Sequence, residues 1–279
     1  MLRDTGAAAA AARQSAAVVA RRGEVVDMQT ALMRRLLAEV VGTGLLVLFG
    51  AGSVVAALTV GKGQLPYAGL GFVCLAFGLV IAVVIYAFGP VSGAHLNPSV
   101  TLSLAVTRRF PWAEAGPYIL AQLVGAFGGA LLIVAAFGAS AVDLGVGSTS
   151  LAPGVPYWQG IVAEVIGTFL LMFAVMALAV DSRAPLGWAG LMIGLAIATA
   201  ILLVGPVTGG ALNPARAFGP YLALSVFGGT VSWSQYPVYV IGPIVGAVAA
   251  ALLYDFIAQT RAAETAAAEE AYTPSPGTP

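Results

Sequence analysis

Long apolar stretches recur along the chain, with polar and charged residues between them. A helix needs about 20 predominantly apolar residues to cross the roughly 30 Å of hydrocarbon in a bilayer. Two acids, Glu39 and Glu164, lie inside the first and fourth of these stretches. The pattern predicts six membrane-spanning helices, at Leu36–Val60, Ala68–Gly89, Ala115–Ala139, Trp158–Val180, Leu186–Val204 and Gln235–Ala258.

Two further apolar segments, Leu96–Val106 and Leu212–Phe227, are too short or too interrupted by Pro and Gly to cross the bilayer. Asn is a favoured N-cap, and Pro is tolerated in the first turn of a helix because its missing N–H is not needed there. The pattern therefore predicts that each segment is a half-helix that starts near the membrane centre. Irregular backbone at that depth must line a cavity or be buried in protein, which predicts a pore or polar site between the half-helices. The Asn-Pro motifs are Asn97-Pro98-Ser99 and Asn213-Pro214-Ala215.

The chain contains an internal repeat. The hexad at residues 38–43 recurs with one substitution at 163–168, and the segment 92–99 recurs in related form at 208–215. Each half holds three predicted crossings, so the second half enters the membrane from the opposite side. Inverted repeats of this kind are typical of transport folds whose functional site lies near the midplane. We take residues 36–139 as the first repeat and 158–258 as the second.

The composition limits the classes of function that the protein could have. Apolar residues make up 59% of the 279 residues and charged residues 9%, whereas about a quarter of an ordinary soluble domain is charged. Lys+Arg and Asp+Glu are both 12, so no basic field is available to bind nucleic acid. With one cysteine, Cys74, and one histidine, His95, we expect no metal site, no cofactor and no internal disulfide. No motif indicates an enzyme, and a polytopic membrane protein is predicted.

Cations indicate the orientation, because Lys and Arg are retained on the cytoplasmic side of short loops. With six crossings, one side holds most of the arginines near the spans, and the other side holds Lys62 and Arg216. Both termini are therefore predicted to be cytoplasmic, as disordered tails at residues 1–33 and 262–279 around a channel domain at 34–261. The arginines on the predicted cytoplasmic side are Arg34, Arg35, Arg108, Arg109, Arg183 and Arg261.

The midplane is expected to be electropositive, because two helix N-termini point at it. Asn97 and Asn213 would present amide donors there. With Arg216 three residues after the second Asn, these motifs resemble the major intrinsic protein family, the aquaporins and their solute-conducting relatives, over roughly Leu36 to Ala258. One departure is Ser99, where the family usually has Ala; we expect altered local hydrogen bonding there without loss of the pore.

The resemblance implies an all-α membrane protein in which six transmembrane helices and two re-entrant half-helices form a right-handed bundle. It further implies a passive channel for water and small uncharged solutes that excludes protons and ions by pore width, lining groups and electrostatic barriers. The implied assembly is a homotetramer in the lipid bilayer of the cell membrane, with one pore in each chain.

In the family, four residues form an outer constriction of the pore. Their counterparts in this sequence are assigned by spacing from the two Asn-Pro motifs. Ile201 stands where water-selective members typically have His, and Gly210 contributes no side chain, so we expect a wider and more apolar opening than in a strict water channel. Ala217 replaces the Asp that is typical of glycerol channels. The set is closest to nodulin-like plant channels that pass metalloid hydroxides, and the subfamily stays open. The four filter positions are Phe77, Ile201, Gly210 and Arg216.

Several alternatives remain at this stage. The channel could serve mainly a neutral solute such as glycerol, urea or a metalloid acid. Intramembrane acids also suit a proton- or sodium-coupled transporter, and a structural junction protein would not need the pore residues. We interpret Glu39 and Glu164 as structural acceptors for the backbone that leads into each half-helix. We assign His95 a structural or vestibule role and Cys74 a place in the packed core.

Overall fold

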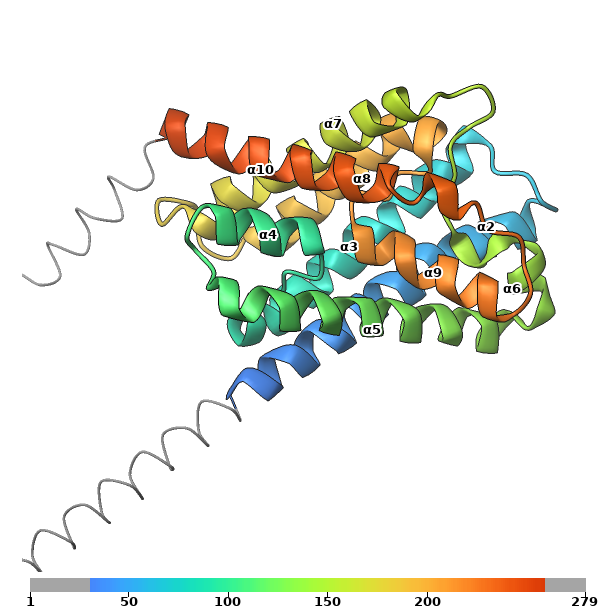
Figure 1. Cartoon of the computed structure of the whole chain (residues 1–279), viewed down its shortest axis with the longest axis horizontal. Coiled ribbons are helices and arrows are strands. Elements are labelled where there is room, and N and C mark those ends of the chain that lie inside the picture. Colours follow the sequence, from blue (N-terminus) through green and yellow to red (C-terminus); the bar gives the residue numbers. More distant parts are fainter. Residues whose placement is uncertain (1–30, 259–279) are drawn as a thin grey trace, which may run out of the picture.

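The computed structural model describes residues 31–258, so the predicted tail at 262–279 lies wholly outside it and only residues 31–33 of the tail at 1–33 lie within it. All of the regular structure in this range is helical (Figure 1). Six helices are long and apolar enough to cross a membrane, which confirms the predicted number of spans. The spans are Ala31–Val60, α3 (Tyr67–Ser92), α5 (Trp112–Phe137), α7 with η3 (Tyr157–Val175 and Met176–Val180), α8 (Ala189–Thr208) and Trp233–Ala258, which contains α10 (Val238–Ala258).

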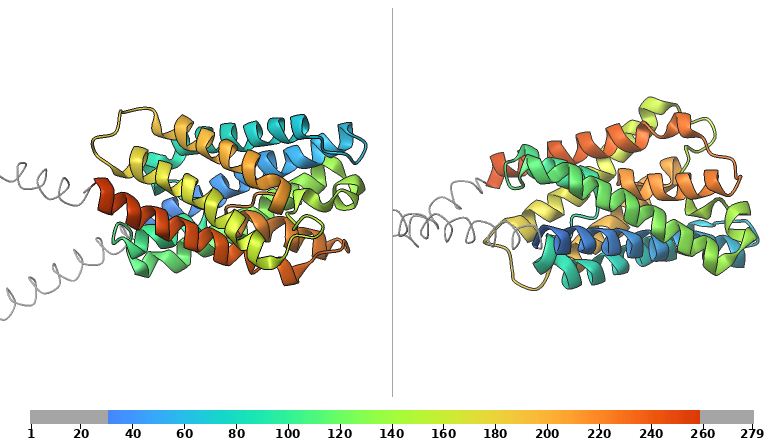
Figure 2. Two further views of the ribbon diagram at one scale, coloured as in Figure 1. Left: turned by 90° about the horizontal axis from the view of Figure 1, so that it is seen from above. Right: turned by 60° about the horizontal axis from the view of Figure 1, so that its bottom comes forward.

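The first span begins at Ala31, so residues 31–33 are helical and do not belong to the predicted tail. It contains the π-helical segment η1 (Leu46–Ala51) and ends with α2 (Gly52–Val60). Both ends of the described chain lie at the same end of the bundle (Figure 2), as an even number of crossings requires. We call this the terminal end and the opposite one the loop end.

The two leftover segments form half-helices inside the bundle, α4 (Pro98–Val106) and α9 (Pro214–Val226), which lie one beyond the other along its length (Figure 1). Both start at the Pro of the Asn-Pro motif with Asn as the N-cap, as that motif predicts, and two residues after the start of the apolar segment. Leu96 and Leu212 have positive φ angles of 55° and 54°, and the Asn that follows each is extended, so the helix cannot include them.

The bounds of the fifth and sixth spans also differ from the predicted ones. The fifth span begins at Ala189 and not at Leu186, because Gly187 adopts a φ of 82° just before it. The same span continues to Thr208, beyond the predicted Val204. The sixth regular helix begins at Val238, after the short 3₁₀ turn η4 (Trp233–Gln235). The loop end also carries α6 (Ala139–Asp143) and η2 (Gly145–Gly147).

Small residues let the helices of each repeat approach closely. A Cβ on Gly125 of α5 would lie 2.2 Å from the carbonyl oxygen of Val40 in the first span. In the second repeat, a Cβ on Gly246 of α10 would lie 2.3 Å from the carbonyl oxygen of Val165 in α7. These two contacts are equivalent in the repeat and leave no room for a side chain. The tight crossings fix the frame that holds the half-helices between them.

Candidate pore between the half-helices

Each half-helix is capped by the Asn of its motif. The Oδ1 atom of Asn97 accepts a hydrogen bond from the backbone N–H of Ser99 at 2.9 Å. Oδ1 of Asn213 accepts from the N–H groups of Ala215 and Arg216 at 2.9 and 3.2 Å. Pro98 and Pro214 occupy the first helical positions, so no further donor is stranded there.

The two Asn side chains also join the repeats. Nδ2 of Asn97 donates to the carbonyl oxygen of Leu212, and Nδ2 of Asn213 donates to the carbonyl oxygen of Leu96, both at 2.8 Å. An amide nitrogen carries two hydrogens, so each side chain keeps one that these bonds do not use. Both side chains line the same cavity. The remaining hydrogens are therefore available to a molecule in it.

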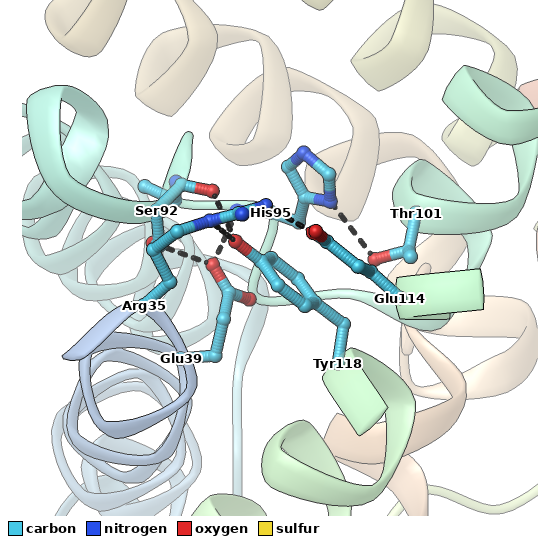
Figure 3. A network of polar contacts seen from close by, with 8 residues as sticks. Arg35, Glu39, Ser92, His95, Thr101, Glu114 and Tyr118 are labelled. Atoms are coloured by element: carbon cyan, nitrogen blue, oxygen red, sulfur yellow. Dashed lines mark hydrogen bonds and ion pairs between the residues drawn. The ribbon is translucent and has the colours of Figure 1, made fainter. Parts of the chain in front are cut away.

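Buried carboxylates hold the backbone before each half-helix. Glu39 accepts from the N–H groups of His95 and Leu96 at 2.9 and 2.7 Å and from the hydroxyl of Ser92 at 2.8 Å (Figure 3). Its side chain is fully buried and does not line the cavity. These bonds satisfy backbone donors that the irregular chain cannot pair itself. Ala94 and Leu96 have positive φ angles, so the carboxylate supports a strained segment.

Glu164 does the same in the second repeat. It accepts from the N–H groups of Ala211 and Leu212 at 3.0 and 2.7 Å and from the hydroxyl of Thr208 at 2.6 Å. Its side chain is also fully buried and absent from the cavity wall. Both acids thus bond the backbone that leads into a half-helix, and neither lines the cavity.

Two buried tyrosines extend these supports, and the sequence analysis did not select them. Tyr118 donates from its hydroxyl to the carbonyl oxygen of Ser92 at 3.0 Å, and Tyr239 donates to that of Thr208 at 2.9 Å. Their separation of 121 residues equals the offset at which Val124-Gly125-Ala126 recurs as Val245-Gly246-Ala247. Extending the repeat along α5 and α10 would have found them.

The cavity has a volume of about 440 Å³ and passes the meeting point of the half-helices. Its wall is mostly aliphatic, with residues such as Ile81, Leu171 and Ile197. The polar side chains on the described part of this wall are those of His95, Asn97, Arg109, Asn213 and Arg216. Apart from the Asn pair, a molecule in the cavity therefore meets three polar side chains on the described wall.

Arg216 lies on the cavity wall in the first turn of α9. Its Nη1 donates to the carbonyl oxygen of Gly147 at 3.0 Å, and its guanidinium carbon lies 5.0 Å from the centre of the Phe77 ring. Stacking on an aromatic face stabilises a cation that is removed from water. Gly147 belongs to η2, and nothing in the sequence pattern indicated this contact. The Gly147 carbonyl and the Phe77 ring together hold the charged guanidinium of Arg216 at the cavity wall.

The comparisons with known proteins agree with this geometry. The family model described as major intrinsic protein matches residues 27–254. The chain belongs to the major intrinsic protein family. It is 48% identical over 240 residues to aquaporin AqpM of Methanothermobacter marburgensis, covering 81% of this chain and 98% of the relative. It is 49% identical over 246 residues to the probable aquaporin AqpM of Archaeoglobus fulgidus, covering 83% and 100%.

A solved structure shows the same fold. The aquaglyceroporin from Plasmodium falciparum superposes with a TM-score of 0.70 at 26% sequence identity, over 80% of this chain and 96% of that one. This chain is thus an integral membrane protein of a channel family and not an enzyme.

The four residues that the sequence assigns to the filter form two close pairs, Phe77 with Arg216 and Ile201 with Gly210. Phe77, Ile201 and Arg216 line the cavity, whereas Gly210 does not. A Cβ on Gly210 would lie 3.0 Å from Cγ2 of Ile201, so the glycine lies directly beside that side chain. Gly210 has a φ of 61°, which also disfavours a larger residue.

Ser99, the departure from the family pattern, is fully buried and away from the cavity wall. We expected altered hydrogen bonding at this position. Its hydroxyl has no hydrogen-bond partner among the described residues. The backbone N–H of Ser99 still donates to Asn97, so the substitution leaves the cap in place.

Proposed function

We propose that the chain forms a passive pore for water and small uncharged solutes and keeps protons and ions out. The observation that carries this proposal is the pair Asn97 and Asn213, whose amide groups are fixed by bonds across the repeats and keep donor hydrogens toward one cavity. The relatives named aquaporin and aquaglyceroporin support the same class of function.

The ion barrier is electrostatic. Two half-helix N-termini converge at the Asn pair, and Arg216 adds a full positive charge on the same wall. Partial and full positive charges repel cations. A water molecule that accepts hydrogen bonds from both amides points its hydrogens away from them, which interrupts a continuous proton wire.

We propose Phe77, Ile201, Gly210 and Arg216 as the selectivity filter. Its two uncharged cavity-lining side chains are apolar, and Gly210 adds none, so it has room for molecules wider than water. The second candidate is therefore a facilitator mainly for a neutral solute such as glycerol, urea or a metalloid acid. A coupled transporter is disfavoured because Glu39 and Glu164 are enclosed behind the cavity wall.

We also propose a homotetramer in the cell membrane with the terminal end cytoplasmic. This orientation places Arg35, Arg108 and Arg183 at the cytoplasmic face. Trp112 and Trp188 near the terminal end and Trp158 and Trp233 near the loop end are exposed and fit the two membrane–water interfaces.

Stopped-flow light scattering on proteoliposomes tests the proposal. Water flux above that of empty vesicles should be linear in the osmotic gradient, with a low activation energy and no accompanying proton flux. Glycerol and urea gradients on the same vesicles separate the two candidates. Saturable or gradient-coupled uptake, or proton current comparable to water flux, would overturn the proposal.

A further inference from the structure

The aromatic ring of the proposed filter lies against a glycine of the first span. A Cβ on Gly50 would lie 2.3 Å from Cε1, 2.4 Å from Cδ1 and 2.9 Å from Cζ of Phe77. Carbon atoms in contact are separated by about 3.5–4.0 Å. Gly50 is itself buried. The Phe77 ring therefore occupies the space that any side chain at position 50 would need.

Gly50 belongs to η1, where the first span departs from a regular α-helix. Single π-helical turns are rare in proteins and often lie at functional sites. The hydroxyl of Ser53 donates to the carbonyl oxygen of Gly50 at 2.6 Å, which holds the backbone of this turn. The irregular turn thus presents a glycine, and no side chain, to Phe77.

The second repeat has no such pair. The offset of 125 residues between the two hexads places Val175 at the position of Gly50. The offset of 116 residues between the two Asn-Pro motifs places Ile193 at the position of Phe77. Val175 and Ile193 both line the cavity. A glycine is therefore no requirement of the repeat at this point, and it is found in the half whose partner residue is an aromatic ring.

The helix that carries Phe77 has little freedom to shift. On the next residue of α3, Gly78, a Cβ would lie 2.7 Å from the carbonyl oxygen of Gly194 in α8. The two helices are therefore in close backbone contact at this level. A larger residue at position 50 would have to displace the Phe77 ring and not the helix.

The open space next to the ring is the cavity. Phe77 lines the cavity and is otherwise buried, with 4% of its surface exposed. The guanidinium carbon of Arg216 lies 5.0 Å from the centre of the ring. A ring pushed away from position 50 would enter the cavity, narrow the opening and change its contact with Arg216.

We propose that Gly50 is a positioning residue that sets the width of the filter. Because it has no side chain, the Phe77 ring lies back against the first span and leaves an opening wide enough for neutral solutes of the size of glycerol or urea. This inference rests on the proposed function as a channel and on the proposed filter.

Gly50→Ala tests the proposal, and Gly52→Ala is its matched control. Gly52 lies two residues further along the same span, and a Cβ there would lie 3.4 Å from Cγ1 of Ile133, an ordinary contact. In proteoliposomes, Gly50→Ala should lower the ratio of glycerol to water permeability about tenfold, an effect that one added carbon has in an apolar pocket. Gly52→Ala should keep the native ratio. Partial unfolding would lower both fluxes in proportion and leave the ratio unchanged, so an unchanged ratio in Gly50→Ala overturns the proposal.

A double-mutant cycle tests whether Gly50 acts through the ring. Phe77→Ala removes the ring, so adding Gly50→Ala to that variant should change neither the permeability ratio nor the midpoint of thermal melting. In the native background, Gly50→Ala should lower the midpoint, because an overpacked core is strained. In Phe77→Leu, which lacks Cε1 and Cζ, the loss should be smaller than in the native background. An equal effect of Gly50→Ala with and without the ring would contradict the positioning role.

The same measurements separate this inference from the proposed function. If the native protein conducts water but excludes glycerol, the channel stands and the role of Gly50 is refuted. If the native protein conducts neither, the proposed function fails, and the melting midpoints of the cycle still decide whether Gly50 and Phe77 are coupled.

Discussion

Tyr118 and Tyr239 make the same hydrogen bond in opposite halves of the molecule. Each donates from a fully buried hydroxyl to the carbonyl of the residue whose own hydroxyl donates to the glutamate of that half. In the first half the tyrosine also accepts from Nε of Arg35 at 2.8 Å. The support of each half-helix therefore extends from the carboxylate to a second transmembrane helix.

Removing this hydroxyl should destabilise the fold. Tyr239→Phe leaves the carbonyl of Thr208 without its donor, and we expect a cost of about 1 kcal/mol. The midpoint of thermal melting in detergent measures it. Tyr157→Phe is the control, because Tyr157 is half exposed. Equal melting midpoints for the two variants would show that the Tyr239 bond adds nothing.

Glu164→Gln should be more severe. A glutamine has one oxygen for the three donors that the carboxylate now satisfies, and its NH₂ would face a backbone N–H. Hydrogen bonds to charged groups contribute about 1.5–3 kcal/mol each, so we expect low yield and a lower melting midpoint. Asp143→Asn, at an exposed position, is the control. Normal stability combined with a loss of gradient-coupled transport would favour a coupled transporter instead.

Asn213→Asp tests the electrostatics of the midplane. It removes the donor to Leu96 and places an anion where two positive helix ends converge. We expect reduced stability and a cation leak, measured as vesicle depolarisation under a potassium gradient. Asn213→Ala, which removes the donor without adding charge, separates the two effects. A folded Asp variant that stays cation-tight would contradict the proposed barrier.

Ile201→His should make the pore more selective for water. The larger polar ring would narrow the opening that Phe77, Arg216 and Gly210 leave, so glycerol flux should fall more than water flux. Ile201→Leu, which preserves volume and polarity, should leave the ratio of the two fluxes near that of the native protein. If the ratio is unchanged in the His variant, the filter positions are assigned wrongly.

Low pH should weaken the hydrogen bonds that Asp181 accepts at the terminal end. Asp181 accepts from the backbone and guanidinium of Arg183 and from the hydroxyl of Tyr254, and the Arg183 bonds hold the pKa of this carboxyl well below its usual range. A carboxyl whose folded pKa is lowered contributes stability above its unfolded pKa of about 4, and loses it as the pH falls toward the folded value. The melting midpoint of the native protein should therefore exceed that of Asp181→Asn clearly at about pH 6 and less at about pH 3. A difference that grows in acid would contradict this sign.

The sequence predicts the architecture well because each membrane-spanning helix requires a long apolar stretch, which is easily recognised in the sequence. Charge-free stretches reveal the spans, and the Asn-Pro motifs reveal where the half-helices begin. Hydrophobicity alone would place the start of α4 too early, since Leu96 is as apolar as a helical residue and its positive φ excludes it from the helix. Hydrophobicity carries no information about backbone strain.

Contacts between distant polar groups were the least predictable. The bond from Arg216 to Gly147 depends on a loop conformation, and Gly147 itself is one glycine among 35. Gln122, which donates hydrogen bonds to Glu39 and to the hydroxyl of Thr101, was not selected from the sequence either. Periodicity shows which face of a helix is buried but not which buried polar groups meet.

The reciprocal bonds of Asn97 and Asn213 have a mechanical consequence. A carrier that exposes its site to one side at a time must let its two halves rock against each other about that site. Here each half holds the other at that point, by an amide that also caps its own half-helix. Rocking would break both of these bonds between the halves at once. The two bonds therefore support the proposed passive pore, a path that stays open at both ends at once and whose speed is set by the passing molecules.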